Sequence, residues 1–558
     1  MSREITKSGM PTLYRQAEGC TSAGANRKSA GDPARSKTLS MPGSLLHRTW
    51  EISSAPGPGW EGRGRQSRNP AIDADEKSDT PIVPRKLPNK GKTPAEVVEG
   101  RGVAEGNAGE TPTRRTQSRG SVSTGLESVR EAARRDRRAR FTALLHHITP
   151  ALLVDSFYEL RRTAAAGVDG VTWTSYEEDL YRRVHELHRE IHTGAYRAKP
   201  SRRTYIPKAD GQLRPLGIAA LEDKIVQQAV VTVLNAIYET DFVGFSYGFR
   251  AGRSQHQALD ALYVAIDTKP VNWILDADIR SFFDQIDHEW TMRFLEHRVA
   301  DRRILRLIRN WLKAGIIDEQ GERVPAERGT PQGAVISPLL ANIYLHYVHD
   351  LWAHQWRKRN ARGQVVLVRY ADDSVYGFQD EWEARRFLTD LKERLSCFGL
   401  ELHPEKTRLI EFGRFAASNR KRKGLGKPET FDFLGFTHVC GKTRKGRFAL
   451  VRLTIKKRMR ATLAAIRARL REMRHTPISE QGKWLRRVIQ GYFNFHAVPG
   501  NLKRLDGFRA EVTRAWRQSL MRRSQKHRMP WSRCNRLVRK YLPSVKQVHP
   551  YPTVRFAS

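Results

Sequence analysis

Apolar and aromatic residues are distributed so unevenly along the 558-residue chain that only part of it can build a packed core. Residues 1–120 contain 38 Gly, Pro and Ser residues but only three aromatic residues, Tyr14, Trp50 and Trp60. The other 438 residues hold 46 of the 49 aromatic residues. A segment so poor in core formers cannot bury enough apolar surface to offset its backbone entropy. We therefore expect a disordered basic leader over residues 1–120 and a folded region after it.

The charge of the chain indicates a nucleic-acid partner. Lys and Arg number 99 against 59 Asp and Glu, which gives a formal net charge of +40 and a pI near 10.5. Such an excess suits neutralisation of phosphates better than small-molecule metabolism or a solubility coat, which tends to be acidic or mixed.

No apolar run is long enough for a membrane span, and the first thirty residues lack a signal-peptide core, so we expect no membrane partner and a cytoplasmic location.

The four cysteines are scattered and never form a Cys-x-x-Cys pair, which argues against a disulfide framework and against a structural zinc site.

Hydrophobic periodicity and turn residues predict helices and short strands mixed without a βαβ repeat, which is typical of an α+β fold. The predicted helices cover residues 127–145, 151–162 and 221–238, and the predicted strands cover 204–207, 213–218, 273–279, 365–370 and 374–378.

After about Leu450 the pattern becomes purely helical. Apolar residues from Ile455 to Met473 recur at spacings of three and four, which predicts one buried helix face. The remaining surface of that helix is basic, and the chain after it continues basic and aromatic. We expect this basic surface to bind nucleic-acid phosphates, with Arg467, Arg469, Arg471, Arg522 and Arg523 as the candidate residues.

Acidic residues at the ends of two predicted strands are candidates for phosphoryl-transfer chemistry. That chemistry uses carboxylates that hold two Mg²⁺ ions about 3.5–4 Å apart. Asp372 and Asp373 fall on a tight turn between two apolar runs, and Asp278 ends a third. Asp276 lies on the same strand face as Asp278 and is a rival ligand by periodicity alone. Taken singly, each motif is also compatible with an ordinary acidic turn.

Five segments in a fixed order raise the specificity of these motifs. They are Asp-Ile-Arg-Ser-Phe-Phe-Asp (278–284), Gly-Thr-Pro-Gln-Gly-Ala-Val-Ile-Ser-Pro-Leu-Leu (329–340), Tyr-Ala-Asp-Asp (370–373), Gly-Leu-Glu-Leu-His-Pro-Glu-Lys-Thr (399–407) and Phe-Leu-Gly-Phe (433–436). Together they resemble the palm motifs of bacterial group II intron-encoded reverse transcriptases and maturases. Residues 167–171, 205–216 and 244–253 resemble the N-terminal extension and fingers of that family.

The resemblance implies a right-hand polymerase with an all-α thumb and maturase region. Its segments would be an N-terminal extension over 121–195, fingers and palm over 196–438, a thumb and maturase-specific helical domain over 450–535, and a basic tail over 536–558 as a candidate DNA-binding segment. No cysteine pair follows residue 440, so we expect no His-Asn-His endonuclease domain. A primer for intron mobility would then come from elsewhere, such as a nascent strand at a replication fork.

The resemblance also assigns residue roles. Asp278, Asp372 and Asp373 match the catalytic triad that holds two Mg²⁺ ions, which favours Asp278 over Asp276. Nucleotide-binding roles fall on Lys208 and Arg214 at the triphosphate, Phe283 at the sugar 2′ position, Gln332 at the incoming nucleotide and Lys406 at the pyrophosphate. Phe283 is equally compatible with a core position, and Lys406 with a surface charge.

The implied function is an RNA-directed DNA polymerase that copies intron RNA and assists splicing, acting in a bacterial cytoplasm and at the nucleoid. Its partners would be group II intron RNA, a DNA target and primer, and deoxynucleoside triphosphates. Two alternatives stay open: a splicing-only RNA-binding maturase with a degenerate polymerase domain, and a retron-like or defence-associated reverse transcriptase. The three aspartates speak against the first alternative, and the helical region after Ile455 speaks against the second.

Overall fold

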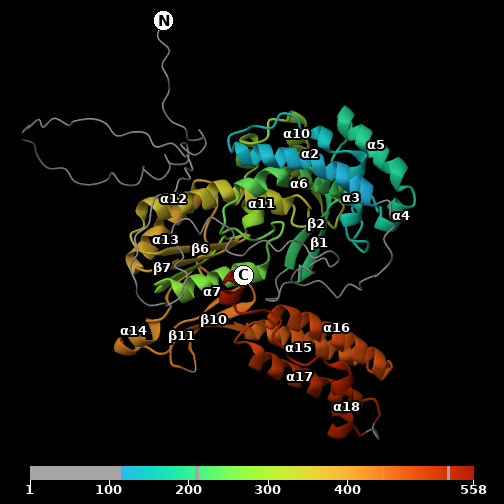
Figure 1. The fold of residues 1–558 in the computed structure, drawn as a ribbon. Helices are drawn as coiled ribbons and strands as arrows, with labels where there is room; N and C mark the ends of the chain where they lie inside the picture. Colours follow the sequence, from blue (N-terminus) through green and yellow to red (C-terminus); the bar gives the residue numbers. More distant parts are fainter. Residues whose placement is uncertain (1–114, 208–212, 444, 525–527, 558) are drawn as a thin grey trace, which may run out of the picture.

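The computed structural model describes residues 115–207, 213–443, 445–524 and 528–557 (Figure 1). Most of the leader expected over residues 1–120 lies outside these residues. The described chain begins with a layer of helices, in which α2 and α3 pack on the long helix α6. Its members are α2 (Arg115–Arg135), α3 (Pro150–Glu159), α4 (Trp173–Glu177), α5 (Leu180–Thr193) and α6 (Leu221–Asp241).

The helix predicted over 127–145 was wrong at both ends, because α2 spans Arg115–Arg135 and only Leu145–His147 form a short 3₁₀ turn. The physical reason is tertiary. Phe141 pairs with Val299 in an isolated bridge, and the Asp301 carboxylate accepts hydrogen bonds from the backbone N–H groups of Leu144 and Leu145 at 2.8 and 2.9 Å. These distant partners satisfy the backbone that a longer helix would have satisfied internally.

A four-stranded antiparallel sheet lies at the centre of the fold, with strand order β6-β7-β3-β8. Its strands are β3 (Trp273–Asp278), β6 (Val365–Tyr370), β7 (Asp373–Phe378) and β8 (Arg408–Glu411). The strands predicted at 273–279, 365–370 and 374–378 are therefore confirmed to within one residue. Helices around this sheet are α7 (Gln255–Thr268), α8 (Phe282–Gln285), α9 (His288–Glu296), α10 (Arg302–Lys313), α11 (Ser337–Leu345), α12 (Leu351–Asn360), α13 (Glu381–Ser396) and α14 (Ala416–Arg422).

A second sheet has the order β2-β1-β4-β5 and carries the predicted hairpin. Strands β1 (Ser201–Pro207) and β2 (Leu213–Ile218) pair antiparallel, and β1 also pairs in parallel with β4 (Ile316–Ile317), which joins β5 (Arg323–Val324). Gly333 lies against this sheet, because a Cβ at residue 333 would lie 2.9 Å from the carbonyl oxygen of Gly217. The contact ties the hairpin to the segment that precedes α11.

The C-terminal part begins with a third sheet of order β11-β10-β9, formed by β9 (Phe431–Phe433), β10 (Phe436–Lys442) and β11 (Phe448–Thr454). Helices α15 (Lys456–Glu472), α16 (Ile478–His496), α17 (Leu502–Met521) and α18 (Trp531–Tyr541) follow, and α19 (Pro552–Ala557) returns to pack on α7. Cys534 and Val538 of α18 belong to the same buried cluster as Leu463 and Ile466 of α15. The expected boundary at residue 536 thus falls inside a packed helix.

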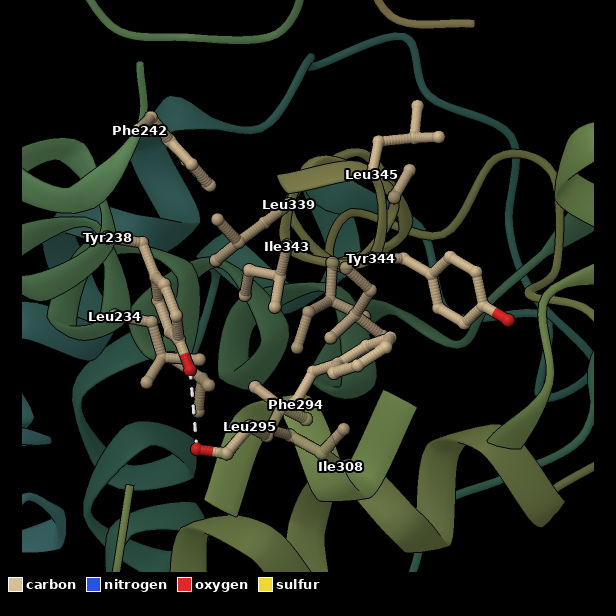
Figure 2. Packing of buried hydrophobic residues seen from close by; sticks show 14 of the residues in the cluster. Leu234, Tyr238, Phe242, Phe294, Leu295, Ile308, Leu339, Ile343, Tyr344 and Leu345 are labelled. Carbon is tan, nitrogen blue, oxygen red and sulfur yellow. Dashed lines mark hydrogen bonds between the residues drawn. The ribbon is translucent and has the colours of Figure 1, made fainter. Parts of the chain in front are cut away.

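The largest apolar cluster connects the N-terminal helices to the central sheet (Figure 2). Leu234 and Tyr238 of α6 pack with Leu339 and Ile343 of α11, and all four are 5% exposed or less. The Tyr238 hydroxyl donates to the backbone carbonyl of Leu295 at 3.3 Å, so its polar atom is satisfied inside the cluster. This core fixes α11, and with it the preceding 329–336 segment. In the part of the chain that the structure describes, no helix is long and apolar enough to cross a membrane.

One buried ion pair lies between the helices and the central sheet. The guanidinium of Arg369 donates to Asp350 at 2.6 Å, and neither side chain is more than 1% exposed. His349 contacts the same carboxylate at 2.8 Å and the Tyr376 hydroxyl at 2.6 Å. Burial alone would raise the pKa of Asp350, but Arg369 and His349 hold that pKa well below its usual range. The carboxylate is therefore ionised in the folded protein.

We predict that Asp350→Asn lowers the stability of the fold by about 3–5 kcal/mol, because it leaves the buried Arg369 charge without its counter-ion. Glu381→Gln removes one partner of the exposed Arg385–Glu381 pair and should cost less than about 1 kcal/mol. Thermal unfolding of the full chain with each substitution measures both effects. Similar melting temperatures for the two variants would contradict the importance of the buried pair.

Candidate active site

The strand register brings two of the predicted catalytic aspartates together. Strand β3 ends at Asp278 and β7 begins at Asp373, and these two residues are direct partners in the antiparallel ladder. Direct partners in such a ladder have their Cα atoms about 4.5–5.5 Å apart. Asp372 lies in the turn one residue earlier and is half-buried, whereas Asp373 is exposed. The three carboxylate residues thus share one end of the central sheet.

Lys406 occupies this end of the sheet as well. Its Nζ atom lies 2.7 Å from Oδ2 of Asp278, with side chains that are 64% and 21% exposed. The segment that carries Lys406 is fixed by main-chain contacts, since the His403 N–H donates to the Asp278 carbonyl at 2.8 Å. The lysine predicted at the pyrophosphate therefore pairs directly with one of the predicted catalytic carboxylates.

Asp276, the rival ligand, lies two residues inside the sheet. Its ladder partners are Val375 and Arg408, and the Arg408 guanidinium lies 3.9 Å from its carboxylate. Burial raises the pKa of Asp276 to about 7, and the Asp278 charge adds to the rise while Arg408 opposes it. Asp276 is thus a carboxyl paired with an arginine inside the sheet, whereas Asp278 lies at the end of its strand, beside Asp373.

The turn that carries Asp372 is held from behind by two residues. Ala371 adopts a left-handed φ of 57°, and its carbonyl accepts a hydrogen bond from Arg369 Nη1 at 2.8 Å. Gly248 lies against the same backbone so closely that a Cβ at this residue would be 2.3 Å from the Ala371 nitrogen. A side chain at position 248 would therefore displace the turn.

A third segment closes the site on the side of Phe283. The Thr330 N–H donates to the Phe283 carbonyl at 2.9 Å, and Gln332 Nε2 donates to Asp284 Oδ1 at 3.1 Å. Phe283 is half-buried and packs against the main core, so both of its predicted environments are compatible with its position. Gln332 is half-buried and lies between the helix that follows Asp278 and the second sheet.

The remaining predicted residues belong to other segments of the chain. Lys208 lies outside the described residues, and Arg214 lies in β2 as the ladder partner of Ile206. On the C-terminal helices, Arg467 pairs with Glu511 at 3.1 Å and Arg469 with Glu472 at 2.7 Å.

Three further arginines complete the predicted RNA-binding set. Arg471 and Arg522 are exposed. Arg523 is half-buried, and its guanidinium donates to the Thr476 carbonyl. Arg523 therefore also has a structural contact within the helical domain.

The donor set at the sheet end consists of carboxylate oxygens, which suit a hard divalent cation such as Mg²⁺. Within the described ranges, no three His, Cys, Asp or Glu side chains are gathered closely enough to form a ready-made metal cluster. The Asp278 carboxylate faces the Lys406 ammonium instead. The residue types and the shared sheet end thus fit a metal site, and a bound cation would take over part of the charge that Lys406 now supplies.

Sequence reasoning missed the residues that support the turn. Gly248 lies in the quoted segment 244–253, but its contact with Ala371 joins positions 123 residues apart and leaves no local signal. Arg369 belongs to the apolar run of strand β6, and its partner Asp350 ends the short π-helical segment His346–Asp350, so neither position carries a local signal. Phe249, which follows Gly248, is 49% exposed at a φ of 56°, and only the structure reveals this strained position.

We predict that Gly248→Ala lowers primer extension on an RNA template by about 100-fold, since misplacing catalytic groups by about 1 Å can cost that much. Gly507→Ala is the matched control, because a Cβ at residue 507 meets nothing within 4 Å and lies within helix α17. Primer extension should be unchanged in this control. Equal activity of both variants in folded preparations would refute the role of Gly248 in placing the turn.

Comparisons with known proteins agree with this geometry. Residues 206–438 match the family model described as reverse transcriptase (RNA-dependent DNA polymerase). Protein YkfC of Escherichia coli is 38% identical over 240 residues, which cover 38% of this chain and 62% of that protein. Group II intron-encoded protein LtrA of Lactococcus lactis is 32% identical over 223 residues, which cover 40% of this chain and 37% of that protein.

A plant protein, nuclear intron maturase 4 of Arabidopsis thaliana, is 26% identical over 143 residues, which cover 26% of this chain and 17% of that protein. The chain thus matches less than two thirds of the length of these relatives. The matched region nevertheless contains the ordered motifs, the ladder that pairs Asp278 with Asp373, and the turn between β6 and β7. Residues 206–438 form a reverse transcriptase domain, and the chain is similar to a group II intron-encoded protein and to an intron maturase.

Proposed function

We propose that this protein copies intron RNA into DNA by nucleotidyl transfer and that it also binds the intron RNA to assist splicing. The observation that carries the polymerase proposal is the register that pairs Asp278 with Asp373 beside a turn anchored by Arg369. An acidic surface turn without a function would not need a buried ion pair and a glycine contact behind it. The anchored turn therefore supports a site whose geometry must be maintained.

Asp278, Asp372 and Asp373 are the residues that would hold two Mg²⁺ ions. When bound, such a pair supplies charge stabilisation to the attacking and leaving oxygens of the displacement. The protein contributes the positions of these carboxylates, which the ladder and the turn fix before substrate binds. Preorganised charge of this kind costs no rearrangement during the reaction.

Neighbouring side chains would select and hold the nucleotide. Lys406 has its ammonium beside Asp278, and there it would protonate the leaving pyrophosphate. Lys208 and Arg214 of the hairpin would hold the triphosphate, since a guanidinium makes bidentate phosphate contacts. Gln332 would pack on the incoming base, and the ring of Phe283 would exclude a sugar 2′-hydroxyl by contact.

The C-terminal helices supply the surface proposed for RNA. Arg467 and Arg471 are exposed on α15 beside the helix face that Leu463, Ile466 and Leu470 bury. A phosphate backbone is recognised by such a surface without any carboxylate chemistry. The DNA target, the primer and deoxynucleoside triphosphates would bind at the palm and not at this helix.

A splicing-only maturase is the second candidate function, because RNA binding by α15 needs no catalysis. The complete aspartate set and its anchored turn favour the polymerase. Primer extension by the purified wild-type protein separates these two candidates. A retron-like enzyme is less well supported, since α15–α18 form a domain with its own buried cluster, and a ribozyme sequence around the gene would decide this question.

We predict that Asp278→Asn and Asp372→Asn each remove more than 99% of Mg²⁺-dependent DNA synthesis on a primed RNA template, a barrier increase of about 2.7 kcal/mol. RNA affinity should change little, because it rests on the basic surfaces. Asp276→Asn is the matched comparison. Its amide imitates the neutral form that a pKa of about 7 already populates, so synthesis should persist. If Asp276→Asn abolishes synthesis and Asp278→Asn retains it, the metal-ligand role belongs to Asp276 and not to Asp278.

We predict that the triple variant Arg467→Gln, Arg469→Gln and Arg471→Gln weakens RNA binding and flattens its salt dependence, by about 0.7–0.9 in the log–log slope for each phosphate that is no longer neutralised. Extension on a short oligonucleotide template should suffer much less. A control with equal charge change carries Arg385→Gln, Arg386→Gln and Lys392→Gln on α13. Unchanged RNA affinity together with a loss of primer extension would instead indicate that α15 holds the template of the polymerase.

A further inference from the structure

A hollow of about 430 Å³ lies between the end of α5, helix α10 and strand β5. In Figure 1, α5 and α10 lie at the upper right, away from β6 and β7. None of the residues that line the hollow belongs to the site described above. Its charged lining residues are all basic, namely Arg197, Arg303, Arg306, Lys313 and Arg323.

The protein satisfies only part of this positive charge. Arg303 pairs with the Asp301 carboxylate at 3.2 Å. Arg197 and Arg323 donate to the backbone carbonyls of Gly194 and Ala314 at 2.7 and 3.0 Å. Among the described residues, Arg306 and Lys313 have no hydrogen-bond or ion-pair partner, although both are exposed at the hollow.

The ends of two helices supply the remaining compensation. Helices α5 and α10 both end at the hollow, at Gly194 and Ala314. Each C-terminus carries about −0.5 of an elementary charge. With the Asp301 carboxylate, these ends offset about two of the five positive charges and leave the hollow near +3. Charges of one sign in a concave site reinforce each other and attract an anion.

The position of Arg306 depends on a glycine. Gly194 adopts a left-handed φ of 78° as the cap of α5, and a Cβ at this residue would lie 2.8 Å from Arg306 Nη2. The glycine therefore allows the sharp turn at the end of α5, and it leaves room for the Arg306 guanidinium against its backbone. The lining also lacks an exposed ring. Tyr196 is buried, and its hydroxyl donates to Asp223 and accepts from Trp311 Nε1.

We propose that this hollow binds the phosphate backbone of an RNA segment that lies outside the template and primer cleft. Guanidinium and ammonium groups without counter-ions suit phosphates, and the absence of an exposed ring among the lining residues argues against recognition of a base or a free nucleotide. The hollow is large enough for a small ligand group, since such sites measure about 300–1,000 Å³. This inference rests on the proposed RNA-binding function. It adds the hollow as a second RNA contact besides the one proposed for α15.

The test compares two double variants with equal charge change in the full-length protein. Arg306→Gln with Lys313→Gln alters the hollow, and Arg385→Gln with Arg386→Gln alters the exposed surface of α13. Binding of a long structured RNA without a primer is measured across a salt titration. We expect the first variant to weaken binding and to reduce the log–log salt slope by about 1 for each phosphate that is no longer bound, with little change in the second.

Two controls keep the outcomes distinct. Primer extension on a short template should be equal in both variants and in the wild type, because neither pair touches the aspartates. Inorganic tripolyphosphate serves as a competitor that has no base or sugar. Equal RNA affinity and slope in the two variants would overturn the proposal, and so would a change in tripolyphosphate binding without a change in RNA binding. Failure of the wild type itself to bind RNA would refute the proposed function instead.

Discussion

The active site depends on one buried ion pair that contains none of its catalytic groups. Arg369 uses its guanidinium to join Asp350, Asn342 and Ser246 from three elements, and it donates to the Ala371 carbonyl as well. Buried pairs of this kind rarely add net stability over apolar residues, but they tolerate very few alternative arrangements. Because Arg369 also holds the Ala371 carbonyl, we infer that the pair restricts the turn to one arrangement and thereby fixes the positions of Asp372 and Asp373.

Local rules were sufficient for the parts of the site that follow strand periodicity. The apolar run that ends at Asp278 and the apolar runs around Asp372 and Asp373 predict the strands, and the observed register then brings Asp278 to Asp373. The same rules could not choose between Asp276 and Asp278, because both lie on one face. What separates them is the end of strand β3, where Asp278 meets the first residue of β7.

Features that rest on distant contacts could not be predicted from the sequence. The end of α2 at Arg135 depends on Asp301, and the turn at Ala371 depends on Gly248, with more than a hundred residues between the partners in each case. The basic surface of α15 was predicted as a phosphate surface, a role that stays a prediction. Arg467 and Arg469 already have acidic neighbours, so an RNA phosphate would compete with Glu511 and Glu472.

In the proposed site, the pair formed by Lys406 and Asp278 would couple the binding of a divalent cation to the binding of a phosphate. Since the ammonium and a divalent cation both stabilise the same carboxylate, each weakens the affinity of the site for the other. Thermodynamic linkage makes such antagonism reciprocal. Any phosphate that draws Lys406 away from Asp278 therefore strengthens cation binding, and a bound cation frees Lys406 to meet a phosphate. The substrate and the cation would then bind with positive cooperativity, through a single lysine that changes partners.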